Sequence, residues 1–218
     1  MVVSESSARR YALDPDVRLM LEVRDDSAAA FEELVARYQD RLVTVLRHQV
    51  GSREQAEDLA QEVFLRVYRA RKSYVPGSKF ATWLFTIANH AAANSLRDRS
   101  RRHETTLCSR DSGPMGARPL DQMLLASSGQ MPARRLDKAE MREIVRMSLE
   151  SLGERQRMAV LLSKFEGMSY AEIAQVMDVS PQALKSLLSR ARENLREVLQ
   201  PYFEYGASPV LEGHGDEQ

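Results

Sequence analysis

Residues 168–192 read MSYAEIAQVMDVSPQALKSLLSRAR, and this stretch carries the clearest structural pattern in the chain. Ser169, with Glu172 three residues later, forms a capping-box pattern that predicts the start of a short helix. Asp178 follows in the turn, where aspartate tolerates a left-handed conformation better than most residues. The pair Ser180–Pro181 predicts the start of a second helix. The pattern indicates a helix-turn-helix, with an ordinary helical hairpin in a bundle as the alternative.

The second helix of this unit separates apolar from polar side chains. Its leucines, Leu184, Leu187 and Leu188, recur at helical spacing and are expected to face inward. The outward positions are Gln182, Lys185, Ser186 and Ser189. A recognition helix is built in this way, because its first turns meet base edges while flanking basic residues hold phosphates. The stretch therefore predicts DNA binding.

The composition of the 218 residues favours helices throughout. Only 6% of residues are aromatic and glycine is sparse, whereas 43% are hydrophobic. We expect an all-α fold of two small helical domains joined by a flexible linker. The expected parts are a disordered N-terminus at 1–13, a helical domain at 14–102, a linker at 103–133, a helix-turn-helix domain at 134–204 and an acidic disordered tail at 205–218.

Helix start and stop signals divide the first domain into four helices. The expected caps are Asp14 before Pro15, Ser27 and Ser52. Gly51 is expected to end the second helix, and a turn over 74–78 precedes a fourth helix from Phe80 to about Arg99. In the second domain, one helix is expected to carry the apolar residues Met141, Ile144, Val145 and Leu149.

Charge is balanced over the whole chain but separated along it. The formal net charge is zero, yet between Arg66 and Arg102 only Asp98 opposes nine basic side chains. Acidic residues gather just before this segment, at Glu54, Glu57, Asp58 and Glu62. Separated signs suit a protein that meets DNA on one face and a basic protein on another.

Targeting and redox signals are absent from the sequence. It has no apolar run long enough to span a bilayer and no signal-peptide pattern, so we expect a cytoplasmic protein without direct membrane insertion. The single cysteine, Cys108, permits neither an internal disulfide nor a cysteine zinc cluster. It is interpreted as an ordinary linker thiol.

Three blocks stand out in order along the chain. They are AEDLAQEVF at 56–64, FATWLFTIA at 80–88 followed by Asn94, Leu96–Arg97 and Arg101–Arg102, and GMSYAEIA at 167–174 with Lys185–Ser186 and Arg190–Arg192. Together they resemble the extracytoplasmic-function sigma factors, the small two-domain sigma subunits of bacterial RNA polymerase. The resemblance covers roughly Asp16 to Phe203. It implies a polymerase-binding helix, a minus-ten region and a minus-thirty-five domain, in that order.

The resemblance implies a factor that directs core RNA polymerase to specific promoters and initiates transcription. The implied partners are the clamp of the largest polymerase subunit, the flap of the second-largest subunit, promoter DNA and an anti-sigma factor. The implied polymerase-binding residues are Asp58, Gln61, Glu62 and Phe64. The implied minus-ten residues are Trp83, Thr86, Asn89, His90, Asn94, Arg97 and Arg101. The implied minus-thirty-five residues are Pro181, Gln182, Lys185, Ser186, Ser189 and Arg190.

Helical spacing puts Asp58, Gln61 and Glu62 on one side of a helix, which suits docking on a basic coiled coil. A merely solvated charged face is the alternative. Opening DNA without ATP requires a pocket for an unstacked base and cations for the single strand. For Trp83, core packing is favoured over base stacking.

The chain departs from the family pattern at several DNA-facing positions. Asn89–His90 stands where the family often has arginine and asparagine, and Asn94 stands where it often has aspartate. Leu187 replaces a common arginine, and Gln182–Leu184 replaces Gly-Thr-Val. Loss of one phosphate contact would flatten the salt dependence of DNA binding by about one unit of slope.

Enzyme function is the weakest option for this sequence. It has no phosphate-binding glycine loop, no metal-ligand cluster and no nucleophile–base pair signalled by spacing, so we expect no catalytic residues, metal or cofactor. Two alternatives to a sigma factor stay open. One is a helix-turn-helix regulator that does not bind core polymerase, and the other is a sigma mimic that sequesters an anti-sigma factor.

Overall fold

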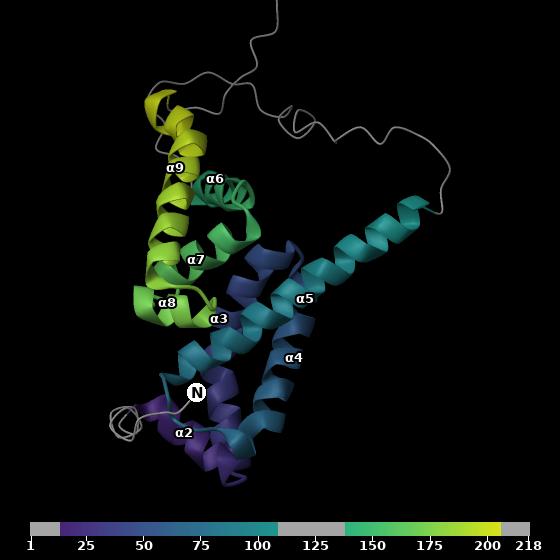
Figure 1. Cartoon of the computed structure of the whole chain (residues 1–218), viewed down its shortest axis with the longest axis vertical. Helices are drawn as coiled ribbons and strands as arrows, with labels where there is room; N and C mark the ends of the chain where they lie inside the picture. The colour runs from purple at the N-terminus through teal and green to yellow at the C-terminus, as the bar shows by residue number, and fades with distance from the viewer. Residues whose placement is uncertain (1–13, 109–137, 206–218) are drawn as a thin grey trace, which may run out of the picture.

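The computed structural model describes residues 14–108 and 138–205, which form helices with no strand in those ranges. The helices in chain order are α2 (Pro15–Arg24), α3 (Ala28–Val50), α4 (Arg53–Ala70), the short 3-10 helix η1 (Arg71–Ser73), α5 (Phe80–Cys108), α6 (Lys138–Glu150), α7 (Glu154–Lys164), α8 (Tyr170–Val176) and α9 (Pro181–Tyr205). Figure 1 shows α2 to α5 as one bundle and α6 to α9 as a second. The all-α expectation is confirmed.

The helix boundaries in the N-terminal bundle follow the side-chain caps that the sequence predicts. The Asp14 carboxylate accepts hydrogen bonds from the backbone amides of Asp16 and Val17 at 3.0 and 3.2 Å. Ser27 and Ser52 cap α3 and α4 in the same way. Gly51 ends α3 with a φ of 79°, a left-handed conformation that glycine adopts without a steric penalty.

A single apolar core fills the space between the helices. Its largest fully buried side chains come from both bundles and include Phe80, Phe85, Leu34, Leu42, Leu161 and Ile173. Along α3, for example, Leu34, Tyr38, Leu42 and Val45 are buried at intervals of three and four residues, which places them on the inward stripe of the helix. The core therefore continues from the N-terminal bundle into the C-terminal one.

Helix α5 is longer than predicted. The sequence places its end near Arg99, whereas the helix continues through Cys108. Neither glycine nor proline occurs between Asn94 and Cys108, so nothing in that segment interrupts the backbone hydrogen bonds. The end of α5 extends away from both bundles (Figure 1). The rest of the expected linker, from 109 to 133, lies outside the described residues.

Two apolar residues of α6 lie on the surface of the C-terminal bundle. Of the four apolar residues expected in this helix, Ile144 and Leu149 are buried in α6, whereas Met141 and Val145 are each 39% exposed. Within this bundle, α9 packs on α6, α7 and α8. The expected disordered segments at 1–13 and 206–218 lie outside the described residues.

The two bundles touch each other. Helix α8 packs against α5, and α7 packs against α3. Helix α6 also touches α3, so the residues that were expected to form two separate domains are in contact with each other.

Candidate nucleic-acid interface

The helix-turn-helix is formed by α8, a four-residue turn and α9, as the sequence predicts. The Ser169 hydroxyl accepts from the Glu172 amide at 3.3 Å, and the Glu172 carboxylate accepts from the Ser169 amide at 2.8 Å, which completes the capping box. Asp178 has a φ of 51° in the turn. The Ser180 hydroxyl accepts from the Ala183 amide at 3.1 Å and so caps α9. These local bonds fix the angle at which α9 leaves the turn.

The first turns of α9 present a polar surface. Leu184, Leu188 and Ala191 are buried against the rest of the bundle. The six predicted minus-thirty-five residues are all exposed, namely Pro181, Gln182, Lys185, Ser186, Ser189 and Arg190. The structure therefore brings the whole predicted set onto one accessible face.

Leu187 lies at the edge of this face rather than within it. Its side chain is partly buried and packs against the apolar core. A leucine here contributes packing in place of the arginine that the family often carries. The departure at Leu187 thus exchanges a cation near the DNA-facing surface for an apolar contact.

Four of the seven predicted minus-ten residues form an exposed stripe along α5. These are His90, Asn94, Arg97 and Arg101, which are separated by four, three and four residues and so share one side of the helix. Arg101 pairs with Asp98 at 2.5 Å. The stripe combines two arginines with an amide and an imidazole, which are groups that can hold phosphates and hydrogen-bond to base edges.

The other three predicted minus-ten residues are partly buried and already in contact with protein. Trp83 packs between Tyr74 and Phe80, with ring centroids 4.9 and 6.2 Å away. The Thr86 hydroxyl donates to the Thr82 carbonyl at 2.8 Å. The Asn89 amide donates to the backbone carbonyl of Val176 in α8 at 3.4 Å. Core packing of Trp83, the interpretation favoured from sequence, agrees with this geometry.

Helix α4 presents an acidic and amide face to solvent. Asp58, Gln61 and Glu62 are all exposed, as their spacing predicts. Glu62 is paired with Arg66 one turn later. Asp58 and Gln61 lie on the same side of the helix, and the face continues toward the end of α4.

Phe64 does not belong to this exposed face. It is only 7% exposed, and its ring meets Phe31 of α3 edge to face at a centroid distance of 6.5 Å. Phe64, which was expected to contact the polymerase, therefore packs in the core of this structure. The neighbouring Leu65 is 53% exposed and sits on the acidic face, where sequence reasoning missed it. Its spacing from Asp58 and Gln61, seven and four residues, is the signal that could have found it.

Residues 14–108 and 138–205 contain neither a metal-ligand cluster nor a membrane-spanning helix. No group of three or more histidine, cysteine, aspartate or glutamate side chains there is arranged to hold a metal ion. No helix in those ranges is both long and apolar enough to cross a membrane.

Comparison with known proteins matches both bundles of the chain to one family. The models of Sigma-70 region 2 and Sigma-70, region 4 match residues 34–102 and 142–195. RNA polymerase sigma factor CarQ of Myxococcus xanthus is 37% identical over 182 residues, which cover 83% of this chain and 95% of that protein. ECF RNA polymerase sigma-E factor of Escherichia coli K12 is 34% identical over 186 residues, which cover 85% and 95%. The chain belongs to the extracytoplasmic-function sigma factors.

A solved structure supports the fold of this sigma factor. The sigma factor RpoE in complex with the anti-sigma factor NepR, from Bartonella quintana, matches with a TM-score of 0.59 at 22% identity, over 78% of this chain and 96% of that one. The region 2 match ends at Arg102, so it contains α4 and the exposed stripe of α5. The region 4 match contains α8, the turn and α9 as far as Leu195.

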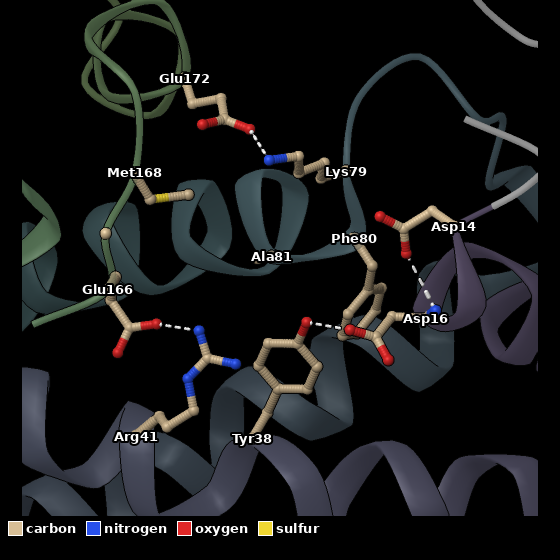
Figure 2. A pocket seen from close by; sticks show the side chains of 11 residues that line it. Asp14, Asp16, Tyr38, Arg41, Lys79, Phe80, Ala81, Glu166, Met168 and Glu172 are labelled. Atoms are coloured by element: carbon tan, nitrogen blue, oxygen red, sulfur yellow. Dashed lines mark hydrogen bonds and ion pairs between the residues drawn. The ribbon is translucent and has the colours of Figure 1, made fainter. Parts of the chain in front are cut away.

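A small polar pocket lies in the sigma factor where the start of the helix-turn-helix meets the N-terminal bundle (Figure 2). Arg41 of α3 pairs with Glu166 at 2.5 Å on one side, and Lys79 pairs with Glu172 at 2.9 Å on the other. Burial raises the pKa of Glu172, but hydrogen bonds from Ser169 and Lys79 outweigh burial and leave the pKa below its ordinary value. The carboxylate is therefore held in its charged form.

Proposed function

We propose that this sigma factor directs core RNA polymerase to promoters by binding the minus-ten element with α5 and the minus-thirty-five element with the first turns of α9. The observation that carries the proposal is the exposure of two separate polar and basic faces, one on each of these helices. Arginine and lysine on such faces neutralise phosphates, while amide and hydroxyl groups contact bases.

For the minus-ten element, the exposed stripe of α5 is the part available to DNA. Asn94 and His90 would contact bases, and Arg97 with Arg101 would hold the backbone of the separated strand. Trp83 has no part in this proposal as a stacking surface, because its ring already packs against the rings of Tyr74 and Phe80.

For the polymerase, we propose that the face formed by Asp58, Gln61, Glu62 and Leu65 docks on the clamp of the largest subunit. Acidic and amide groups complement a basic surface, and an exposed leucine between them supplies apolar contact. Contact with the flap of the second-largest subunit and inhibition by an anti-sigma factor are further proposals. They rest on the family to which the chain belongs.

The experiment compares Asp58→Arg with the wild type in two binding assays. The variant should fail to comigrate with core polymerase in gel filtration, while the full chain should still bind duplex DNA through α9. Glu32→Arg, a charge change of the same kind at an exposed carboxylate of α3, is the matched control and should keep core binding. Comigration of Asp58→Arg at wild-type strength would contradict the assignment of this face. A wild type that binds DNA but never core would support a simple helix-turn-helix regulator instead.

A further inference from the structure

The first turn of α9 carries one side chain that can recognise a base by hydrogen bonds. Pro181, Ala183 and Leu184 have no hydrogen-bonding group in their side chains, whereas Gln182 ends in an amide. Gln182 is exposed, and no other residue among 14–108 and 138–205 hydrogen-bonds to that amide. Because the first residues of a recognition helix are those that meet base edges, both the donor and the acceptor of the amide are available to DNA.

The backbone that carries Gln182 is fixed by local contacts. The Ser180 hydroxyl accepts a hydrogen bond from the Ala183 amide at 3.1 Å and so caps the helix. One turn later, the Ser186 hydroxyl donates to the Gln182 carbonyl at 3.2 Å. Leu184 is fully buried and anchors the same turn in the core. Gln182 therefore projects from a backbone that is ordered before DNA binds, so binding has to fix only the torsions of the side chain.

The polar neighbours of Gln182 on α9 differ from it in chemistry. Lys185 and Arg190 are exposed cations, which suit phosphates. Ser186 uses its proton in the bond to the Gln182 carbonyl, so its oxygen offers only acceptor sites to a ligand. With cations nearby to hold the DNA backbone, the neutral amide of Gln182 contributes most at a base edge.

An amide side chain matches one base of the major groove better than the others. Glutamine offers an NH2 donor and a carbonyl acceptor side by side. Adenine presents the complementary pair, with N7 as acceptor and the N6 amino group as donor, so both hydrogen bonds form at once. Guanine presents two acceptors, N7 and O6, and would leave the amide carbonyl facing an acceptor. Cytosine and thymine each present one polar group there, so they allow one bond at most.

We propose that Gln182 selects an adenine in the minus-thirty-five element. Its NH2 group donates to N7, and its carbonyl oxygen accepts from the N6 amino group. The inference rests on the proposed function, because the first turns of α9 must lie in the major groove, and it adds the base that is recognised and the residue that selects it. Gln182 stands where the family often has glycine, which has no side chain, so the selectivity is a property of this chain.

The first test uses the full chain in complex with core polymerase and promoter fragments in which each minus-thirty-five base pair is varied in turn. The wild type should prefer adenine at one position by roughly tenfold, the size of effect expected of a bidentate contact. Gln182→Ala should lose that preference and keep the preferences at the other positions. Gln182→Glu should move the preference to cytosine, because the N4 amino group of cytosine donates to a carboxylate.

The second test removes one acceptor from the DNA. 7-Deazaadenine has a C–H group in place of N7 but keeps the N6 amino group and the pairing with thymine. At the preferred position it should weaken binding of the wild type by about fivefold, as expected for one lost hydrogen bond, and it should not affect Gln182→Ala. Equal weakening of both proteins would assign the preference to DNA shape and overturn the proposal.

The control variants are Gln39→Ala and Gln39→Glu, which make the same changes at an exposed glutamine of α3 and should keep every wild-type preference. Unchanged preferences in the Gln182 variants, a shift of Gln182→Glu to a base other than cytosine, or an equal loss of affinity of Gln182→Ala for all fragments would each overturn the proposal. These results would leave promoter binding by α9 intact. A wild type without preference at any minus-thirty-five position would contradict the proposed function as well, so the two failures are distinguishable.

Discussion

The indole ring of Trp83 lies 4.9 Å from the phenol ring of Tyr74, centroid to centroid. Tyr74 is 4% exposed, and burial raises the pKa of its hydroxyl well above the ordinary value. Trp83 therefore packs against the segment between η1 and α5 and holds Tyr74 in the core. An aromatic residue on a proposed DNA-binding helix acts here as a structural support.

This relationship predicts that Trp83→Ala acts on stability first. Loss of the ring contacts should lower the free energy of unfolding by about 3 kcal/mol, since truncation leaves a cavity beside Tyr74 and Phe80. Trp83→Phe should lower the free energy of unfolding by about half as much, because a smaller ring still fills part of the space. Urea denaturation followed by circular dichroism measures both. If Trp83→Ala keeps wild-type stability but loses DNA opening, Trp83 contacts a base after all.

Substitutions at the adjacent residues Phe64 and Leu65 should have different effects, the first on stability and the second on polymerase binding. Phe64→Ala removes a buried ring and should lower the free energy of unfolding by about 3–4 kcal/mol. Leu65→Ala should change it by less than about 0.5 kcal/mol, because the side chain is half exposed, yet weaken core binding about tenfold. Denaturation and a core-binding titration on the same samples check the pair. Equal effects of the two variants on core affinity would contradict the placement of Leu65.

The sequence predicted the local hydrogen bonds of the helix-turn-helix better than it predicted which of Phe64 and Leu65 faces the solvent. Ser169 with Glu172, and Asp178 in the turn, interact within a few positions, so their pattern is visible in order along the chain. Phe64 belongs by spacing to the inward stripe with Val63 and Val67, and the structure buries it there. The family resemblance nevertheless assigned it to the polymerase face, because a motif names neighbouring residues without separating the two sides of a helix.

The ion pair between Arg41 and Glu166, which joins the two bundles, could not be predicted from the sequence. Arg41 and Glu166 are 125 residues apart, and nothing local marks either of them as a partner of the other. The end of α5 was also missed, because the basic residues after Asn94 were taken as the approach to a linker, although no residue there breaks a helix.

Lys185 should contribute to minus-thirty-five binding through charge. Lys185→Ala should reduce the slope of log affinity against log salt by about one unit if it holds one phosphate. Gln182→Ala should keep the slope and relax base preference. Promoter-fragment titrations with the polymerase complex at several salt concentrations distinguish the two. Identical slopes for Lys185→Ala and the wild type would remove Lys185 from the phosphate contacts.

His48 should make stability depend on pH. Burial, then Arg47, Arg157 and Arg146, lower its pKa below the ordinary value of 6.5, and Glu150 opposes them. The folded protein therefore binds this proton less readily than the unfolded chain. The contribution of neutral His48 to the free energy of unfolding is fully present above pH 6.5, and it is lost as the pH falls through the lowered pKa of the folded state.

The matching variant is His48→Gln, which removes the titrating group. Urea denaturation at pH 7.5 and at pH 5.5 should show a smaller loss of stability for this variant than for the wild type. An identical loss in both proteins would assign the pH dependence to other groups.

Run-off transcription with purified core polymerase, on the DNA that lies upstream of the gene for this protein, tests the central claim most directly. The wild type should yield a transcript of one defined length. Asp58→Arg and the double variant Arg97→Ala with Arg101→Ala should each lose most of it, the first for lack of core binding and the second for lack of strand separation. No promoter-specific transcript on this template, together with no comigration with core, would contradict the account.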